Sequence, residues 1–310
     1  MPTAPADPIS TLIVEVASKL ESARAKVNLA LHVTGRRTDG YHLLDSLVVF
    51  CELADTLEAV PQEESAVGLS VDGRFADDLD RAGPPRDNLI LRAADALIAA
   101  YPGRSLDGVR IVLTTRLPVA AGRGGGSADA AAALRLLDRL WGWETEAETL
   151  ARIGIGLGAD VPACLLSRPL KVEGIGERTK LASGIPELPL VLVNPGIALP
   201  TRAVFHRLKS PDGAPMWPLP PRFKSLIEFA QWLRVNRNDL SEPAEAEAKI
   251  VGTVVRTVAS DPECLIARMS GSGATVFGMF NSQAAAERAA ARIHAAKPAW
   301  WVAATRSGGS

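Results

Sequence analysis

A glycine-rich segment near the middle of the chain carries the strongest chemical signal in the sequence. Four glycines fall within the five positions 122–126, and Ser127 follows them directly. Glycines let backbone amides turn inward with no side chain in the way. An Ala/Leu-rich helix is predicted to start at about Ser127, and its free amides and positive dipole end would point to the same place. This nest of donors suits a polyphosphate, and the Ser127 hydroxyl is placed to touch a phosphate or a bound magnesium ion.

The same segment has a plainer interpretation, in which it is only a tight strand-to-helix turn capped by Ser127. We favour phosphate binding because of the four glycines. The segment is not a Walker loop, because no Gly-Lys-Ser/Thr sequence ends it. It also lacks the dinucleotide-binding fingerprint, because Ser127 stands where the third glycine is required.

A lysine and an aspartate outside this loop could supply the remaining parts of a kinase site. Lys26 begins a segment, 26–33, whose apolar and polar residues alternate as in a half-buried strand, and it shares a face with Asn28 and His32. Asp160 follows a predicted helix that ends in glycine. Phosphoryl transfer to an alcohol needs a carboxylate to take or orient the hydroxyl proton and a cation to keep that carboxylate ionised. Taken singly, Lys26 is more often a surface lysine and Asp160 a cap or turn residue, and their separation in sequence leaves open whether they meet.

Composition and charge argue against several other classes of protein. Of 310 residues, 47% are apolar and 22% are charged, and the formal net charge is -1. A nucleic-acid-binding protein usually carries a basic excess, which this chain lacks. No apolar run approaches the roughly 20 residues that span a bilayer. The three cysteines are far apart and suggest buried thiols in a reducing compartment, and the four histidines include no paired metal-binding motif. We therefore expect a cytoplasmic protein with no nucleic-acid, membrane or protein-held metal partner; the oligomeric state is not indicated.

The elements that must position these residues are strands and helices in mixed order. Short alternating runs predict strands at 11–16, 26–33, 43–50, 56–60, 67–71, 109–113, 190–194, 274–280 and 300–304. Helices are predicted at 88–100, 127–140, 146–157, 201–208, 225–235, 244–258 and 282–295. The lack of strict alternation favours an α+β fold over a doubly wound parallel sheet. A change of composition after residues 174–176 places a domain boundary at about residue 178, which gives domains 1–178 and 179–310.

A series of motifs resembles the GHMP kinase superfamily, which includes galactose, homoserine, mevalonate and phosphomevalonate kinases. The motifs occur in family order over nearly the whole chain from residue 23 onward, and such a series is far more specific than any one motif. The matching segments are 25–31, 35–37, 39–42, 118–130, 158–162, 173–177, 193–196, 238–240 and 269–274. Two positions depart from the family pattern: Arg123 stands where an apolar residue is usual, and Ala128 where a second serine is common.

The resemblance implies a two-domain GHMP kinase fold with the active site in the interdomain cleft. The N-terminal domain would be ribosomal-S5-domain-2-like and the C-terminal domain ferredoxin-like. Asp160 would be the catalytic base and Lys26 its partner. ATP, with Mg²⁺, would bind through Pro118, Gly122, Gly124, Gly125, Gly126, Ser127 and Ala128.

The motifs are most similar to those of superfamily members that phosphorylate the 2-hydroxyl of a cytidine diphosphate-linked methylerythritol in non-mevalonate isoprenoid biosynthesis. The resemblance implies that Tyr41 and His42 hold the cytidine, with Phe205 as a stacking partner, and that Asn28 contacts the erythritol portion. A pyrimidine offers two faces for stacking and an edge for hydrogen bonds, so aromatic partners are physically reasonable.

Two alternative functions stay open at this point. One is a GHMP-type kinase for a different small alcohol, such as homoserine or a mevalonate derivative; Tyr41, His42 and Phe205 argue against it, because those substrates have no base to stack. The other is a non-catalytic nucleotide-binding protein, and the presence of both Lys26 and Asp160 argues against that.

Overall fold

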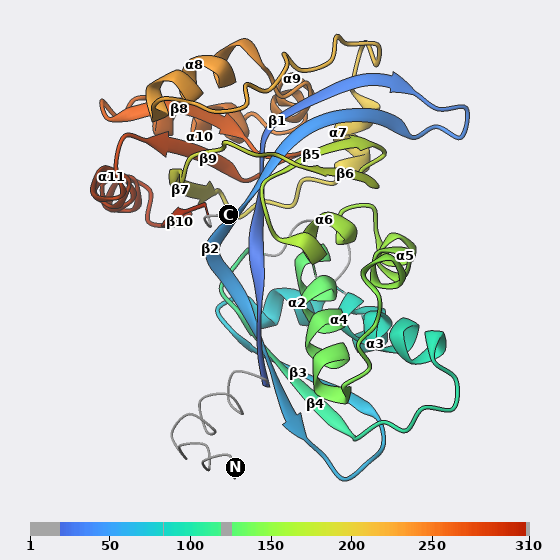
Figure 1. Cartoon of the computed structure of the whole chain (residues 1–310). Coiled ribbons are helices and arrows are strands. Elements are labelled where there is room, and N and C mark those ends of the chain that lie inside the picture. The colour runs from blue at the N-terminus through green and yellow to red at the C-terminus, as the bar shows by residue number, and fades with distance from the viewer. Residues whose placement is uncertain (1–18, 83, 119–125, 308–310) are drawn as a thin grey trace, which may run out of the picture. The chain divides into compact units, whose positions relative to one another are not determined.

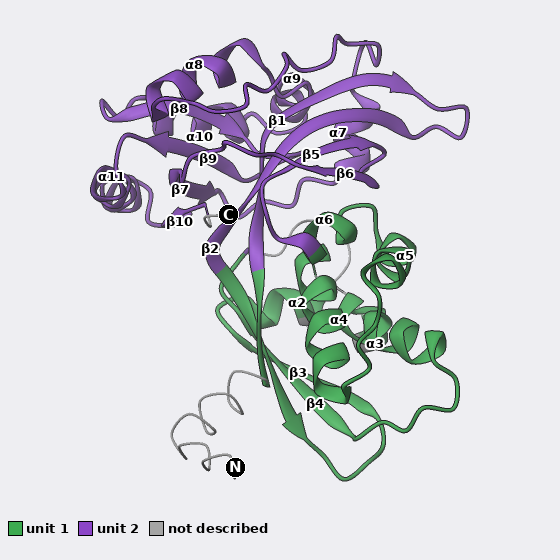
Figure 2. Ribbon diagram, viewed as in Figure 1, with its two compact units in different colours: residues 1–23, 54–117, 124–165 green, residues 24–53, 118–123, 166–310 purple. Residues whose placement is uncertain are grey.

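The structure is a computed structural model, and it describes residues 19–82, 84–118 and 126–307 (Figure 1). The predicted strand at 11–16 and Gly122, Arg123, Gly124 and Gly125 lie outside the described residues. The chain forms two compact units, which Figure 2 colours separately. Unit 1 consists of residues 1–23, 54–117 and 124–165, and unit 2 of residues 24–53, 118–123 and 166–310.

Two long strands pass from one unit into the other. β1 (Leu20–Arg36) contains the predicted strand 26–33, and β2 (His42–Pro61) contains both 43–50 and 56–60 in one uninterrupted strand. Within unit 2, Leu53 N donates a hydrogen bond to Thr305 Oγ1, which keeps the middle of β2 extended. Because β1 and β2 contribute to both units, the units do not follow a simple division into N- and C-terminal halves, and the boundary at residue 178 stays a prediction.

Unit 1 combines strands with a group of helices. The second half of β2 pairs antiparallel with β4 (Val109–Thr115), and β3 (Val67–Gly73) pairs in parallel with β4. The helices are α2 (Ala76–Ala82), the 3-10 turn η1 (Pro85–Asp87), α3 (Leu89–Ala100), α4 (Ser127–Trp141), α5 (Ala147–Leu157) and nearly all of α6 (Val161–Leu166). α3 packs against α4 and α5. Asn88 caps α3 as its side chain accepts a hydrogen bond from Ile90 N, so this helix begins where the sequence predicts.

Unit 2 is built on a four-stranded antiparallel sheet. Its order is β10 (Trp301–Arg306), β7 (Pro189–Asn194), β9 (Val276–Phe280) and β8 (Cys264–Met269). α10 (Ile250–Ala259) and α11 (Gln283–Ala296) pack on this sheet (Figure 1) and bury apolar residues such as Val254 and Ala289. The remaining elements are β5 (Leu170–Gly174), β6 (Arg178–Leu181), α7 (Thr201–His206), α8 (Leu226–Val235) and α9 (Ser241–Glu247). β5 pairs antiparallel with both β6 and the first half of β2. In the described parts of both units, no helix is long and apolar enough to cross a membrane.

The predicted single helix at 244–258 is wrong, because two helices occupy this part of the chain. α9 ends at Glu247 and α10 begins at Ile250, with Ala248 extended between them. No glycine or proline occurs at 244–251, so the sequence offers no local stop signal. The two helices contact each other, and the carboxylate of Glu245 in α9 lies where a Cβ on Gly252 of α10 would stand. The break between them is therefore known only from the structure.

A buried histidine joins β1 to two segments, one that follows α7 and one that follows α8. His32 Nε2 accepts a hydrogen bond from Arg237 N (3.0 Å), so the ring proton must lie on Nδ1, which donates to Ala214 O (2.9 Å). The side chain is completely buried. Burial lowers the pKa of His32, and this effect outweighs the Ala214 carbonyl, which raises it.

The lowered pKa predicts a specific pH dependence of stability. Above pH 6.5 His32 is neutral in both states, and its hydrogen bonds contribute fully; below pH 6.5 the unfolded chain binds a proton that the folded chain resists. We expect the free energy of unfolding to fall more steeply in the wild type than in His32→Gln as pH drops from 7.5 to 5, because glutamine can donate and accept but does not titrate. Urea unfolding of both proteins at several pH values measures this difference. Parallel curves for the two proteins would contradict it.

Candidate active site

Two buried carboxylates fix the ends of the glycine-rich segment. Asp55 Oδ1 accepts hydrogen bonds from Arg116 N (2.5 Å) and Leu117 N (2.9 Å), just before the segment begins. Asp129 Oδ2 accepts one from Gly126 N (2.8 Å), at the point where α4 starts. All of these residues belong to unit 1. Unit 1 therefore holds the backbone on both sides of the proposed phosphate loop through side chains that the fold itself supplies.

These two acids resist ionisation together. Burial, followed by the charge of the nearby Asp55 carboxyl, raises the pKa of Asp129 to about 7, although the hydrogen bond from Gly126 N opposes the shift. Burial also raises the pKa of Asp55 despite the two amide donors. Neither residue was predicted from the sequence to belong to the site. The N-cap of α4 is Gly126 and not Ser127, so Asp129 stands three positions after the cap and binds its amide as in a capping box. Asp55 had no such local signal, since its partners are 61 and 62 residues away.

The predicted base lies on the same unit as the start of α4. Ser127 is the first residue of α4 and is partly buried. A Cβ placed on Gly158 would lie 3.7 Å from Ser127 Oγ, in ordinary van der Waals contact. Asp160 follows two residues later, immediately before α6, and its carbonyl accepts a hydrogen bond from Cys164 N. The structure thus brings the segment that carries Asp160 next to the serine of the proposed phosphate loop. Pro118, Gly126 and Ala128 are described as well, and their contacts with a nucleotide stay a prediction.

The predicted lysine and substrate residues lie in unit 2. Lys26 and Asn28 are two positions apart in β1 and therefore share a face of the strand. Lys26 is partly buried and Asn28 is buried. Because Lys26 belongs to unit 2 and Asp160 to unit 1, the proposed pairing of the two side chains stays a prediction.

The guanidinium group of Arg268 binds part of β1, and this residue was not predicted from the sequence. Arg268 Nη1 donates to Leu29 O (2.9 Å), and Nη2 donates to Leu233 O and Asn236 O (both 2.8 Å). Among the described residues no carboxylate forms an ion pair with Arg268, and burial lowers its pKa to about 10. The three carbonyl acceptors take the place of a counter-ion, and they fix the strand at the residue after Asn28.

The predicted aromatic residues are brought together in part. The rings of His42 and Phe205 stack with their centroids 5.0 Å apart and an interplanar angle of 24°. Tyr41 is 61% exposed. Burial, followed by the charge of Arg36, lowers the pKa of His42, so the ring is neutral at pH 7 and offers one donor and one acceptor nitrogen. Tyr41 directly precedes His42 in the chain, and aromatic rings of this kind suit a flat heterocycle.

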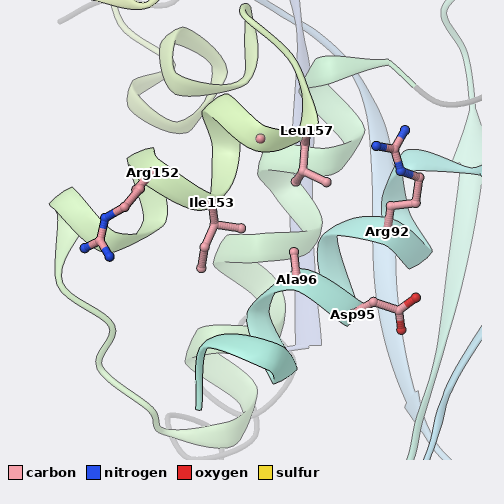
Figure 3. Close-up of a pocket in the computed structure, with 7 residues that line it drawn as sticks. Arg92, Asp95, Ala96, Arg152, Ile153 and Leu157 are labelled. Atoms are coloured by element: carbon pink, nitrogen blue, oxygen red, sulfur yellow. The ribbon is translucent and has the colours of Figure 1, made fainter. Parts of the chain in front are cut away.

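A surface depression of unit 1 does not contain any of these groups. It has a volume of about 540 Å³ and lies between α3 and α5, where it is lined by Arg92, Asp95, Ala96, Arg152, Ile153, Gly156 and Leu157. Figure 3 shows the guanidinium groups of Arg92 and Arg152 on opposite sides of the depression. The depression therefore lacks the convergent donors that a phosphate requires. In the described residues, no group of three or more His, Cys, Asp or Glu side chains could hold a metal ion.

Comparison with known proteins identifies the family. The model of the GHMP kinases N terminal domain matches residues 88–168, and that of the GHMP kinases C terminal domain matches residues 221–299. A protein of Chelativorans sp. (strain BNC1) is 48% identical over 93% of this chain and 96% of its own length. One of Paramagnetospirillum magneticum (strain ATCC 700264 / AMB-1) is 49% identical over 91% of this chain and 95% of its own length. The chain belongs to the GHMP kinases, and the predicted fold class and phosphotransferase activity are confirmed.

The relatives with this degree of identity share one name. Both of the proteins above are called 4-diphosphocytidyl-2-C-methyl-D-erythritol kinase. The crystal structure of a 4-(cytidine 5'-diphospho)-2C-methyl-D-erythritol kinase matches with a TM-score of 0.75 and 34% identity, and covers 94% of this chain and 100% of its own. The homoserine kinase of Cytophaga hutchinsonii matches with a TM-score of 0.65 but only 16% identity, over 94% of each chain, and so shows a common fold alone.

The raised pKa of Asp129 leads to a test of its burial. Below pH 3.8 Asp129 is protonated in both states; between pH 3.8 and about 7 the unfolded chain ionises while the folded chain keeps the proton, so the wild type loses stability as pH rises through this window. An asparagine in its place would keep an oxygen for Gly126 N but does not titrate. We therefore expect Asp129→Asn to gain stability relative to the wild type between pH 5 and pH 8, by about 3 kcal/mol at most. Urea unfolding at both pH values measures the difference, and a constant offset between the two proteins would contradict the assignment.

Proposed function

We propose that this chain transfers the γ-phosphoryl group of ATP to the 2-hydroxyl of 4-diphosphocytidyl-2-C-methyl-D-erythritol in isoprenoid precursor biosynthesis. The observation that carries the proposal is an identity of 48–49% over more than nine-tenths of the chain with relatives of that name. In the reaction, the hydroxyl oxygen forms a bond to the γ-phosphorus, the bond to the β-phosphate oxygen breaks, and ADP leaves. A cytoplasmic location, expected from the sequence, belongs to the same proposal.

Asp160 and Lys26 are proposed as the catalytic pair. The Asp160 carboxylate orients the substrate hydroxyl and accepts its proton as the new oxygen–phosphorus bond forms. Lys26 keeps that carboxylate ionised and attracts the transferring phosphoryl group. The segment that carries Asp160 passes Ser127 at Gly158, two residues before the acid, and this supports its role, because a γ-phosphate bound at the start of α4 would be close to this segment.

The nucleotide's phosphates are proposed to bind the segment from Pro118 to Ala128. The positive end of the α4 dipole and the Ser127 hydroxyl lie at this segment, and Ser127 Oγ is next to Gly158. The hydroxyl oxygen of Ser127 is the kind of ligand that Mg²⁺ prefers. The ion would arrive with ATP, and phosphate oxygens would be its other ligands. Mg²⁺ would offset phosphate charge; the amides and Ser127 orient the nucleotide.

The cytidine base is proposed to bind at Tyr41, His42 and Phe205. Neutral His42 can hydrogen-bond to the pyrimidine edge, and the aromatic rings offer faces for stacking. A smaller alcohol without a base would leave these rings unused. This surface therefore favours the cytidylyl substrate over homoserine or mevalonate derivatives, which are the substrates of fold relatives with low identity.

Replacement of the proposed base tests the mechanism. We expect Asp160→Asn to lower kcat by about 10²- to 10⁴-fold, because the amide cannot accept the hydroxyl proton. The affinity for ATP and the thermal midpoint should change little. Asp95→Asn is a matched control, because Asp95 is an exposed aspartate of the same unit in the depression of Figure 3. A coupled assay of ADP release measures turnover, and near-normal turnover by the Asp160 variant would remove its assigned role.

Removal of an aromatic ring tests the substrate. We expect Phe205→Ala to raise KM for the cytidylyl substrate by about 5- to 150-fold, since stacking of a base on an aromatic ring contributes about 1–3 kcal/mol. KM for ATP should stay within about twofold. Trp217→Ala serves as a control, because Trp217 is a 65% exposed aromatic residue of the same unit.

A panel of alcohols in the same assay of ADP release tests which substrate the protein phosphorylates. The wild type should release ADP with the cytidylyl substrate and not with homoserine or mevalonate. Turnover with one of those alcohols alone would replace the proposed substrate, and ATP binding without turnover on any of them would favour a non-catalytic protein.

A further inference from the structure

A short chain of hydrogen bonds fixes the side chain of Asn28. Asn28 Nδ2 donates to Ser46 Oγ (2.9 Å), and Ser46 Oγ donates to Ala30 O (2.7 Å). The backbone of Asn28 is held separately, since its N–H donates to Ser270 Oγ (3.0 Å). Ser46 is 1% exposed and Asn28 is 8% exposed, so water competes little for these bonds.

The direction of these bonds follows from the number of protons. A serine hydroxyl has one proton, and Ala30 O can only accept, so the Ser46 proton is used there. Ser46 Oγ is left with acceptor capacity alone on its other side. The group of Asn28 that faces it must therefore be the amide NH₂, and Oδ1 must point away from Ser46. A carboxamide has nearly the same shape in its two orientations, so this hydroxyl is what distinguishes them.

The side-chain oxygen Oδ1 of Asn28 lies next to Gly271, where the lack of a side chain leaves room. A Cβ on Gly271 would lie 3.3 Å from Asn28 Oδ1, closer than most carbon atoms approach, and Gly271 has a φ of +57° that disfavours other residues. In the described part of the chain, no group donates a hydrogen bond to Asn28 Oδ1. The strand thus presents a fixed acceptor, on the same face of β1 as Lys26.

We propose that Ser46 is a positioning residue that holds Asn28 with Oδ1 as the acceptor for a hydroxyl group of the sugar-alcohol portion of the substrate. The inference rests on the proposed function. It adds that the site selects a hydrogen-bond donor at this point of the substrate and rejects an ether or a deoxy carbon there, because Oδ1 would be left unsatisfied. Without the Ser46 hydroxyl, the Asn28 amide can rotate and present its NH₂ group to the substrate instead. The substrate hydroxyl could accept a hydrogen bond from that group, but the geometry would not be fixed.

A double-mutant cycle on Ser46 and Asn28 tests the proposal through activity. We expect Ser46→Ala to lower kcat/KM for the cytidylyl substrate by about 2- to 10-fold, the range of one neutral hydrogen bond, with KM for ATP unchanged. Ser46→Thr keeps the hydroxyl and should retain most of the activity. In an Asn28→Ala background, Ser46→Ala should have no further effect, because Ser46 acts through Asn28. Equal losses in both backgrounds, or full activity of Ser46→Ala, would overturn the proposal.

A second measurement does not depend on turnover. In ¹⁵N-labelled wild-type protein, one Asn28 side-chain amide proton should exchange slowly with solvent because it is bonded to Ser46 Oγ, and it should exchange fast in Ser46→Ala. Fast exchange in the wild type would overturn the assigned orientation. The two failures are distinguishable: a wild type that does not phosphorylate the cytidylyl substrate rejects the proposed function, whereas an active wild type with an unaffected Ser46→Ala variant rejects only the role of Ser46.

Discussion

The proposed phosphate site depends on backbone amides, and a glycine-rich backbone has little rigidity of its own. Glycine loses more conformational freedom on ordering than any other residue, so such a segment needs anchors outside itself. Asp55 and Asp129 provide them by binding the amides of Leu117 and Gly126. Their burial costs ionisation energy, which is visible in the raised pKa values of both. The two buried acids thus lower the stability of unit 1 at neutral pH, and they fix the two ends of a segment whose amides are proposed to bind phosphate.

A related arrangement in unit 2 fixes strand β1. Asn28 N donates to Ser270 Oγ, and the carbonyl of the next residue accepts from Arg268. Asn238 Nδ2 donates to Met269 O and Gly271 O, so the turn that meets Asn28 is itself held in place. Ser270, Arg268 and Asn238 are all far in sequence from their partners, and the side chain of each forms its hydrogen bonds with backbone atoms. Side chains on this part of β1 are therefore presented by a strand with little freedom to shift, which is what a substrate contact requires.

Much of the fold could be predicted from the sequence because its signals are local. Alternation at 26–33 marks part of β1, and Asn88 marks the start of α3 through a bond to an amide two residues away. The sequence failed at Ala248, which is extended between α9 and α10 although no glycine or proline stands at 244–251. It also gave no reason to join 43–50 and 56–60 into one strand, because the bond that keeps Leu53 extended comes from Thr305.

For the candidate site, the sequence by itself determined which chemical groups the chain has and in which order: a glycine-rich segment, Lys26, Asp160 and the aromatic residues, in the series that marks a GHMP kinase. Only the tertiary structure decided how these groups are oriented. It placed Ser127 beside Gly158, stacked His42 on Phe205, and set the amide of Asn28 through Ser46. The physical reason is that a residue type specifies which bonds are available, whereas the direction of a hydrogen bond depends on a partner that the chain brings back from a distant position.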